Sequence, residues 1–389
     1  MKKNNLADFQ IPYGKQDISN EDIEAVKDVL NSDFITQGPK VSQFEESFSK
    51  YVGSKYAVSV SSGTAALHLS CLALGVNRNS KVISSPITFA ASVNAIHYCN
   101  GRVDFCDIDP KSLTLDINQV REKLSIAPKG TYSGIIPVDF AGYPVNMEKF
   151  KDLADEFNLW LLEDSCHAPG GYFIDKNGLK QNCGNGKFAD LAIFSFHPVK
   201  HITCGEGGMI TTNNFKLYEK LKLLRSHGIT KTRKNMTEYH GGWYYEMNDL
   251  GYNYRMPDIL CALGISQLNR AEKKLKRRIE LANNYNDAFK DLDLKTPRID
   301  SKNKHAFHLY VIQLENRKGL YEYLKKRGIN TQVHYIPIHK QPFYERLYGK
   351  QTFINSEQYY SKCLSLPLYP SLEDKEQDFI IKEIKNFLS

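Results

Sequence analysis

Hydrophobic positions in the first two thirds of the chain alternate between short apolar runs and longer segments with helical spacing. Six runs have the length and composition of strands, at residues 56–61, 81–85, 134–139, 160–164, 191–195 and 209–212. Between the third and fourth runs, one helix face is marked by Met147, Phe150, Leu153, Ala154 and Phe157. Strands that alternate with helices in this way predict an α/β fold with a mostly parallel central sheet.

The pattern changes near residue 257. Apolar spacing predicts one long helix over residues 258–289, which we expect to link two parts of the chain. Beyond it we expect a strand at 305–314, a helix at 318–327, a strand at 331–336 and a terminal helix at 375–388. The chain therefore divides into a large α/β domain at residues 1–260 and, at residues 261–389, the linking helix with a small C-terminal α+β domain.

Composition is that of an ordinary globular protein, with 41% hydrophobic and 24% charged residues among 389. The amino terminus has positive charge without an apolar stretch behind it, and no run of about 18 uncharged apolar residues occurs. The eight cysteines include no closely spaced pair of the kind that binds metal or forms a redox centre. We therefore expect a cytoplasmic protein with reduced thiols and no membrane partner.

A basic run and a set of histidines could suggest nucleic-acid or metal binding. The basic run 273–278 continues a helical pattern, so we interpret it as a solvated helix face and predict no nucleic-acid partner, despite the net charge of +7. A metal enzyme is a weaker hypothesis, because only two of its candidate ligands have close spacing and both lie in a predicted strand. Those candidates are His227, His240, His305, His308, His334 and His339. We predict no metal site.

Lys200 is the strongest candidate for catalysis. It follows the apolar run 191–194 and precedes a turn rich in glycine at 205–208, which argues that it faces a crevice. A lysine amine that is transiently neutral can form a Schiff base with an aldehyde and can later move a proton. The alternative, a surface lysine in a loop, is the commonest fate of this residue type.

Two further segments would complement Lys200. Asp164 ends a strand expected at the centre of the sheet, where its carboxylate could pair with the protonated ring nitrogen of pyridoxal phosphate or could simply cap a turn. Gly63 and Thr64 open a helix after a strand, so they could bind a phosphate, with Ser195 adding a hydroxyl, or form an ordinary helix cap.

Aromatic residues near these segments could contact the cofactor ring. Phe89 lies just after a strand and could stack on the ring, while His167 could approach its other face or its phenolic oxygen. A core phenylalanine and a structural histidine are the simpler interpretations of each residue alone. In their order along the chain, the motifs around Gly63, Asp164 and Lys200 together predict an aminotransferase-like enzyme with pyridoxal phosphate.

At this level of detail the chain resembles the DegT/DnrJ/EryC1/StrS sugar aminotransferases over nearly its whole length. The resemblance rests on residues 62–67, 86–89, 163–168, 194–200, 206–208, 225–228, 251–256 and 332–339. It implies the PLP-dependent transferase fold of type I, similar to aspartate aminotransferase. It also implies an enzyme that acts on keto sugars carried by nucleotides.

The resemblance also implies roles for single residues. Lys200 would be the Schiff-base lysine, Asp164 the partner of the ring nitrogen, and Phe89 the stacking aromatic. The phosphate would contact Gly63, Thr64 and Ser195, and Asn253 would reach in from the second subunit of a homodimer with shared active sites. Related 3-dehydratases have histidine in place of the lysine, so Lys200 favours transamination.

Finer similarities, at Pro12-Tyr13, residues 30–38, the loop from Lys200 and the segment from His334, point to one group in the family. Its members use L-glutamate to aminate the 4-keto group of a UDP-linked 6-deoxy-N-acetylhexosamine. The residues that would line the substrate site are Tyr13, Asp33, Phe34, Ile35, Thr36, His334, Tyr335, Ile336, Pro337 and Ile338. His201 and Cys204 stand at positions that vary between subfamilies.

Two alternatives to this function stay open. The substrate could be another nucleotide-linked 4-keto sugar, such as a precursor of UDP-4-amino-arabinose or of a legionaminic-type sugar. The protein could also keep the fold as a binding protein without turnover, although the presence of both Lys200 and Asp164 argues against this.

Overall fold

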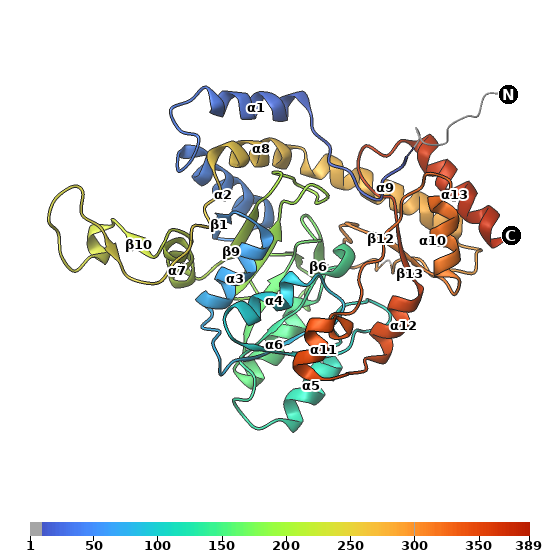
Figure 1. Ribbon diagram of the computed structural model, residues 1–389, viewed down its shortest axis with the longest axis horizontal. Coiled ribbons are helices and arrows are strands. Elements are labelled where there is room, and N and C mark those ends of the chain that lie inside the picture. Colours follow the sequence, from blue (N-terminus) through green and yellow to red (C-terminus); the bar gives the residue numbers. More distant parts are fainter. Residues whose placement is uncertain (1–9, 299) are drawn as a thin grey trace.

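A seven-stranded sheet lies at the centre of the protein (Figure 1). The computed structural model describes residues 10–298 and 300–389, so the first nine residues of the expected large domain lie outside the described part. In spatial order the strands are β1 (Tyr56–Val60), β9 (Gly208–Thr212), β8 (Leu191–Ser195), β5 (Trp160–Asp164), β4 (Gly134–Ile136), β2 (Lys81–Ser84) and β3 (Arg102–Phe105). Only β9 runs antiparallel to the other strands of the sheet. The predicted α/β class with a mostly parallel sheet is confirmed.

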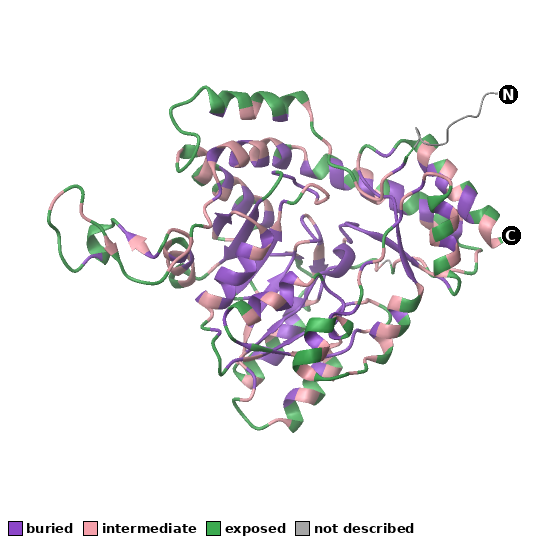
Figure 2. Ribbon diagram, viewed as in Figure 1, coloured by how far each residue is buried: buried purple, intermediate pink, exposed green. Residues whose placement is uncertain are grey.

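All six predicted strands belong to this sheet, and their burial explains why they were detectable. β8 and β9 are buried along almost their whole length, as expected for strands covered on both faces (Figure 2). The seventh strand, β3, was not predicted because polar Arg102 and Asp104 alternate with its two buried residues. An edge position tolerates that pattern.

Helices cover the sheet, and all but the last of them connect its parallel strands. They are α3 (Gly63–Ala73), α4 (Ala91–Tyr98), α5 (Ile117–Ile126), α6 (Met147–Phe157) and α7 (Phe215–Arg225). The predicted helix face near residue 150 corresponds to α6. Before the sheet, α1 (Asn20–Leu30) packs on α8 (Asp258–Asn269), and α2 (Pro39–Val52) packs on both α8 and β1. Within the described residues, no helix combines the length and apolarity that a membrane span needs.

The single long helix expected at 258–289 is wrong, since the chain forms α8 and then α9 (Ala271–Phe289). The break lies at Arg270, whose guanidinium bonds the carboxylates of Asp17 and Asp22. These contacts come from about 250 residues upstream, so local periodicity could not reveal them.

The basic run 273–278 lies on α9. We expected all of it to be a solvated helix face, but only part of it is exposed. Lys274 and Arg278 are buried, and Arg278 donates hydrogen bonds to the carbonyl oxygens of His308 and Leu368.

The C-terminal part has its own hydrophobic core. β12 (Tyr310–Gln313) pairs antiparallel with β13 (Cys363–Leu366), and α9, α10 (Arg317–Lys325) and α13 (Asp374–Leu388) pack around them. The expected strand at 305–314 is shorter, because residues 306 and 309 bond to the turn at 141–142 instead. The expected strand at 331–336 is wrong: it forms a single bridge, Gln332 to Ser365. The domain boundary near residue 260 stays a prediction.

The remaining elements are short. Strand pairs form between β6 (Tyr172–Ile174) and β7 (Lys180–Asn182), and between β10 (Ile229–Thr230) and β11 (Glu246–Met247). The others are the helices α11 (Pro342–Tyr348) and α12 (Ile354–Lys362), and the 3₁₀ turns η1 (Phe140–Gly142), η2 (Arg233–Asn235) and η3 (Ile338–Lys340). β10 and β11 belong to an arm, residues 229–250, that projects from the body (Figure 1).

A largely buried ion pair joins α2, α7 and β1. Glu45 of α2 contacts the guanidinium of Arg225, at the end of α7, at 2.5 Å, and both side chains are 12% exposed. The same carboxylate accepts hydrogen bonds from the backbone and side chain of Ser59 in β1. Removal of one partner would leave the other charge buried and unpaired, which is the costly case for such pairs.

We predict that Glu45→Ala lowers the free energy of unfolding by about 3 kcal/mol, measured by denaturant titration. The adjacent Glu46 provides a matched control, because its ion pair with Lys50 is exposed. Glu46→Ala is expected to leave stability almost unchanged. Equal losses in the two variants would contradict the proposed role of the buried pair.

Candidate active site

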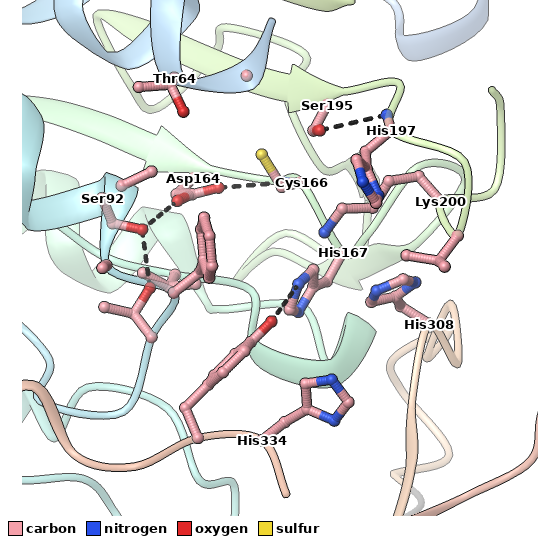
Figure 3. A pocket seen from close by; sticks show the side chains of 18 of the residues that line it. Thr64, Ser92, Asp164, Cys166, His167, Ser195, His197, Lys200, His308 and His334 are labelled. Atoms are coloured by element: carbon pink, nitrogen blue, oxygen red, sulfur yellow. Dashed lines mark hydrogen bonds between the residues drawn. The ribbon is translucent and has the colours of Figure 1, made fainter. Parts of the chain in front are cut away.

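A cavity of about 620 Å³ opens beside the carboxyl ends of β5 and β8, and most of the predicted site residues line it (Figure 3). Because β5 and β8 are parallel neighbours, the residues that follow them lie at one edge of the sheet. The predicted residues brought together are Tyr13, Gly63, Thr64, Phe89, Asp164, His167, Ser195, Lys200, His334, Tyr335, Ile336 and Ile338.

One end of the cavity is built to hold an anion. Ser62 caps α3 by accepting a hydrogen bond from Ala65 N, while the N–H groups of Gly63 and Thr64 have no acceptor among the described residues. A side chain at Gly63 would lie 2.9 Å from Ser195 Cβ, so only glycine lets the helix end and β8 approach this closely. Free N–H groups, a helix N-terminus and the hydroxyls of Thr64 and Ser195 fit a phosphate.

Asp164 lines the same cavity. Its side chain is 4% exposed, and its two oxygens accept hydrogen bonds from Ser92 Oγ at 2.7 Å and from Cys166 N at 3.2 Å. Among the described residues, no cationic side chain forms an ion pair with it. A buried carboxylate without a cation fits a protonated ring nitrogen as its missing partner.

Lys200 reaches the cavity from the loop after β8, and its side chain and Asp164 point into the same space (Figure 3). Within the described residues, its amine forms no hydrogen bond or ion pair. Burial lowers the pKa of Lys200 below its ordinary value, and Cys166 and Asp164 partly oppose this effect. A lowered pKa increases the fraction of neutral amine, which is the form that attacks an aldehyde.

Histidines form a neutral wall beside Lys200. Burial lowers the pKa of His167 and His308 well below the ordinary value and that of His334 to about 3. Ala141 N–H donates to His167 Nδ1 at 3.2 Å, so the proton of the neutral ring sits on Nε2, which faces Tyr335 Oη at 3.4 Å. His167 therefore directs its Nε2–H at the hydroxyl of Tyr335, and both side chains line the cavity.

Phe89 presents an aromatic face to the cavity. Its side chain is 59% exposed although the loop around it is buried, and the ring lies 6.1 Å from that of Tyr335. An exposed aromatic ring beside a concave polar site favours stacking on a ligand ring. Together, the anion-binding helix end, Asp164, Lys200 and Phe89 fit the phosphate, ring nitrogen, aldehyde and ring face of pyridoxal phosphate.

Some predicted residues do not line the cavity of this chain. Asn253 is exposed and pairs with Ser226, and Pro337 lies beside the cavity without lining it. Asp33, Phe34, Ile35 and Thr36 form an exposed turn between α1 and α2. His201 and Cys204 are both buried outside the cavity, and His201 bonds the carbonyl of Ala306.

Sequence reasoning missed several lining residues, which are Thr88, Ser92, Cys166, Glu206, His308, Gln332 and Gln341. Thr88 and Ser92 had a detectable signal, because they flank the candidate Phe89 at a spacing of four residues. His308 and Gln341 had none, because they reach the cavity only through the packing of the C-terminal part on the sheet.

The histidine-based metal hypothesis finds no support within the described residues. The one close group of three potential ligands there is Asp139, Glu163 and Cys183, and no histidine belongs to it. These side chains are fully buried, and burial raises the pKa of Asp139 to about 6 and that of Glu163 well above its ordinary value.

Comparison with known proteins agrees with this geometry. The DegT/DnrJ/EryC1/StrS aminotransferase family matches residues 16–385. The spore coat polysaccharide biosynthesis protein SpsC of Bacillus subtilis is 37% identical over 388 residues, 97% of this chain and 97% of SpsC. A Campylobacter jejuni protein named UDP-4-amino-4,6-dideoxy-N-acetyl-β-L-altrosamine transaminase is 37% identical over 377 residues, 95% of each chain.

Among solved structures, the Helicobacter pylori aminotransferase PseC, described as involved in the biosynthesis of pseudoaminic acid, superposes with a TM-score of 0.87. It is 31% identical, and the match covers 98% of this chain and 99% of PseC. The family match over almost the whole chain, supported by relatives of this identity along their full lengths, shows that the protein belongs to the DegT/DnrJ/EryC1/StrS aminotransferase family.

Proposed function

We propose that this protein transfers the amino group of L-glutamate to the 4-keto group of a UDP-linked 6-deoxy-N-acetylhexosamine. Its family makes it an aminotransferase, and pyridoxal phosphate is its cofactor. The observation that carries the proposal is that Lys200 and Asp164 line one cavity together with the anion-binding start of α3. These three groups would hold a single cofactor molecule at its aldehyde, ring nitrogen and phosphate.

Each cofactor-binding residue has a separate task. Gly63, Thr64 and Ser195 would hold the phosphate, Asp164 the ring nitrogen, and Phe89 one face of the ring. The bound cofactor supplies an aldehyde for amines and a ring that withdraws electrons from the reacting carbon. His167, with its proton on Nε2, would donate a hydrogen bond to Tyr335 Oη and so orient that hydroxyl toward a ring substituent or the substrate.

Lys200 would provide both the attachment point and the proton transfer. Its side chain is part-buried, and this desolvation lowers its pKa, so it loses its proton more readily than an exposed lysine. In the neutral form Nζ can accept a proton from the substrate carbon and then donate it to the cofactor. The histidines beside Lys200 are neutral because burial lowers their pKa, so they add no positive charge to the site.

The sugar assignment rests on relatives and on the polarity of the cavity mouth. The C. jejuni relative is named as a transaminase of UDP-4-amino-4,6-dideoxy-N-acetyl-β-L-altrosamine, and PseC is described as involved in the biosynthesis of pseudoaminic acid. Tyr13, Gln332, His334 and Gln341 supply hydrogen-bonding groups of the kind that recognise sugar hydroxyl and amide groups. SpsC has the same identity to this chain, so another nucleotide-linked 4-keto sugar is the alternative substrate.

We also propose a homodimer with shared active sites. The arm at residues 229–250 projects from the body and exposes Trp243 at 76%, Leu250 at 73% and Met247 at 65% (Figures 1 and 2). Large exposed apolar groups on a projecting segment favour contact with another chain. Asn253 and the turn at 33–36, which lie outside this chain's own cavity, would then complete the cavity of the partner.

A cytoplasmic location is the last part of the proposal. All eight cysteines are free thiols, and all but Cys166 are buried, which suits a reducing compartment.

A panel of UDP-linked 4-keto sugars tests the substrate assignment. With glutamate as donor, release of 2-oxoglutarate and mass spectrometry of the sugar nucleotide measure turnover. We expect kcat/KM for UDP-2-acetamido-2,6-dideoxy-β-L-arabino-hexos-4-ulose to exceed that for an arabinose-type 4-keto sugar by at least about tenfold. The reverse order would reject the sugar assignment, and no turnover with any member would favour a binding protein.

The role of Lys200 is tested by Lys200→Ala. We expect the visible absorbance of the loaded protein to disappear and kcat to fall by at least about a thousandfold, because attachment and proton transfer are lost together. Absorption spectra and steady-state kinetics measure the two effects. Lys129→Ala, at an exposed position, should change neither. Retention of the visible band in Lys200→Ala would show that another amine binds the cofactor.

Mixing inactive variants tests the shared site. Lys200→Ala and Asn253→Ala should each be inactive alone, whereas subunits refolded or exchanged together should recover about a quarter of wild-type activity, because half the dimers are mixed and each has one intact site. Native mass spectrometry verifies subunit exchange. Exchange without recovery would mean that Asn253 acts within its own chain.

A further inference from the structure

Two buried hydroxyl groups lead directly to Asp164. Thr88 lies in the loop after β2, and Ser92 lies in the first turn of α4. Thr88 Oγ1 is 2.7 Å from Ser92 Oγ, which is 2.7 Å from Asp164 Oδ2, and both hydroxyl residues are 1% exposed. Figure 3 shows Ser92 and Asp164 joined at the wall of the cavity.

The direction of donation in this chain of hydrogen bonds follows from its chemistry. An ionised carboxylate can only accept, so Ser92 must donate its single proton to Asp164. Ser92 therefore accepts from Thr88, whose own hydroxyl proton is directed at Ser92. The relay runs from Thr88 through Ser92 to Asp164, and a hydrogen bond to a charged group is about twice as strong as a neutral one.

The relay leaves Asp164 able to bind a further donor. Each carboxylate oxygen has two acceptor positions, and Ser92 and Cys166 N use one on each oxygen. Because both oxygens are fixed, the orientation of the remaining lone pairs toward the cavity is fixed as well.

The same relay ties the carboxylate to the aromatic ring beside it. Phe89 lies between Thr88 and Ser92 in the sequence, so both hydrogen-bonded residues belong to the segment that carries the ring. The backbone of this segment is held in turn by Ile338 N, which donates to the carbonyl of Pro86 at 2.9 Å. A change at Ser92 would therefore affect the register between Phe89 and Asp164.

We propose that Ser92 and Thr88 are positioning residues for the transamination reaction. They orient the ionised Asp164 toward the ring nitrogen of the cofactor and thereby keep the proton on that nitrogen. The inference rests on the proposed cofactor site and extends it to two residues that do not themselves need to touch the substrate.

The charged and titratable groups that face Asp164 are Asp139, Cys166, Lys200 and Tyr335. All four stay in place when the Ser92 hydroxyl is removed. In Ser92→Ala the carboxylate loses a hydrogen-bond donor and its fixed orientation, so it would no longer keep the proton on the ring nitrogen and the ring would be less cationic. A less cationic ring holds the proton at the Lys200 linkage more tightly, which moves the midpoint of the visible titration to higher pH.

The experiment uses the full-length protein loaded with pyridoxal phosphate labelled with ¹⁵N in the ring. For Ser92→Ala we expect the ¹⁵N signal to shift toward that of a neutral ring and the pH midpoint of the visible band to rise by about one unit. Thr88→Val should produce a smaller shift in the same direction, because Thr88 acts through Ser92. Ser92→Thr retains the hydroxyl and should restore both readouts toward wild type.

Ser84→Ala is the matched control. Ser84 is equally buried, and its hydroxyl donates a hydrogen bond to the carbonyl of Ile136 at 2.9 Å. The variant loses this bond, but the bond does not involve Asp164. It should lower stability without moving the ¹⁵N signal or the pH midpoint. Unchanged readouts in Ser92→Ala, or equal shifts in Ser84→Ala, would overturn the proposal. The cofactor site would still be supported as long as the wild-type protein shows its visible band. Absence of that band in the wild type would reject both.

Discussion

The parallel pairing of β5 with β8 is the constraint on which the active site depends. It places Asp164 opposite Ile193, so that Ser195 and the loop that carries Lys200 leave the sheet beside the carboxylate. The antiparallel β9 then returns next to β8 and brings Gly208 against the start of α3. One edge of one sheet thus collects an anion site, a carboxylate and an amine from segments far apart in the sequence.

Electrostatics in the cavity follow from what surrounds these groups. The carboxylate of Asp164 receives hydrogen bonds but no cation, and the part-buried Lys200 has no anion bonded to its amine. The imidazoles nearby are neutral because burial disfavours their charged form. A carboxylate and a set of N–H and hydroxyl donors in one cavity suit a ligand with a basic ring nitrogen and a phosphate, which accounts for the fit to a phosphorylated pyridine.

Sequence patterns and tertiary contacts disagree at places where distant residues bond the chain. The break between α8 and α9 at Arg270 depends on Asp17 and Asp22, and residues 305–309 leave the strand conformation because they bond the turn at Ala141 and Gly142. Segment 331–336 has an extended pattern of apolar residues, yet it lines a cavity instead of joining a sheet. In each case the competing hydrogen bonds come from residues that no local window contains.

The sequence by itself determined the α/β class, six of the seven central strands and the motifs around Gly63, Asp164 and Lys200, because buried strands and tight turns have strong local signatures. Tertiary structure alone decided which side chains share the cavity with them. Ser92 and Thr88 join Asp164 because the loop after β2 and the start of α4 reach the end of β5, and His308 and Gln341 arrive with the C-terminal part. Contacts of this kind depend on the packing of whole elements, which the spacing of residues along one segment does not encode.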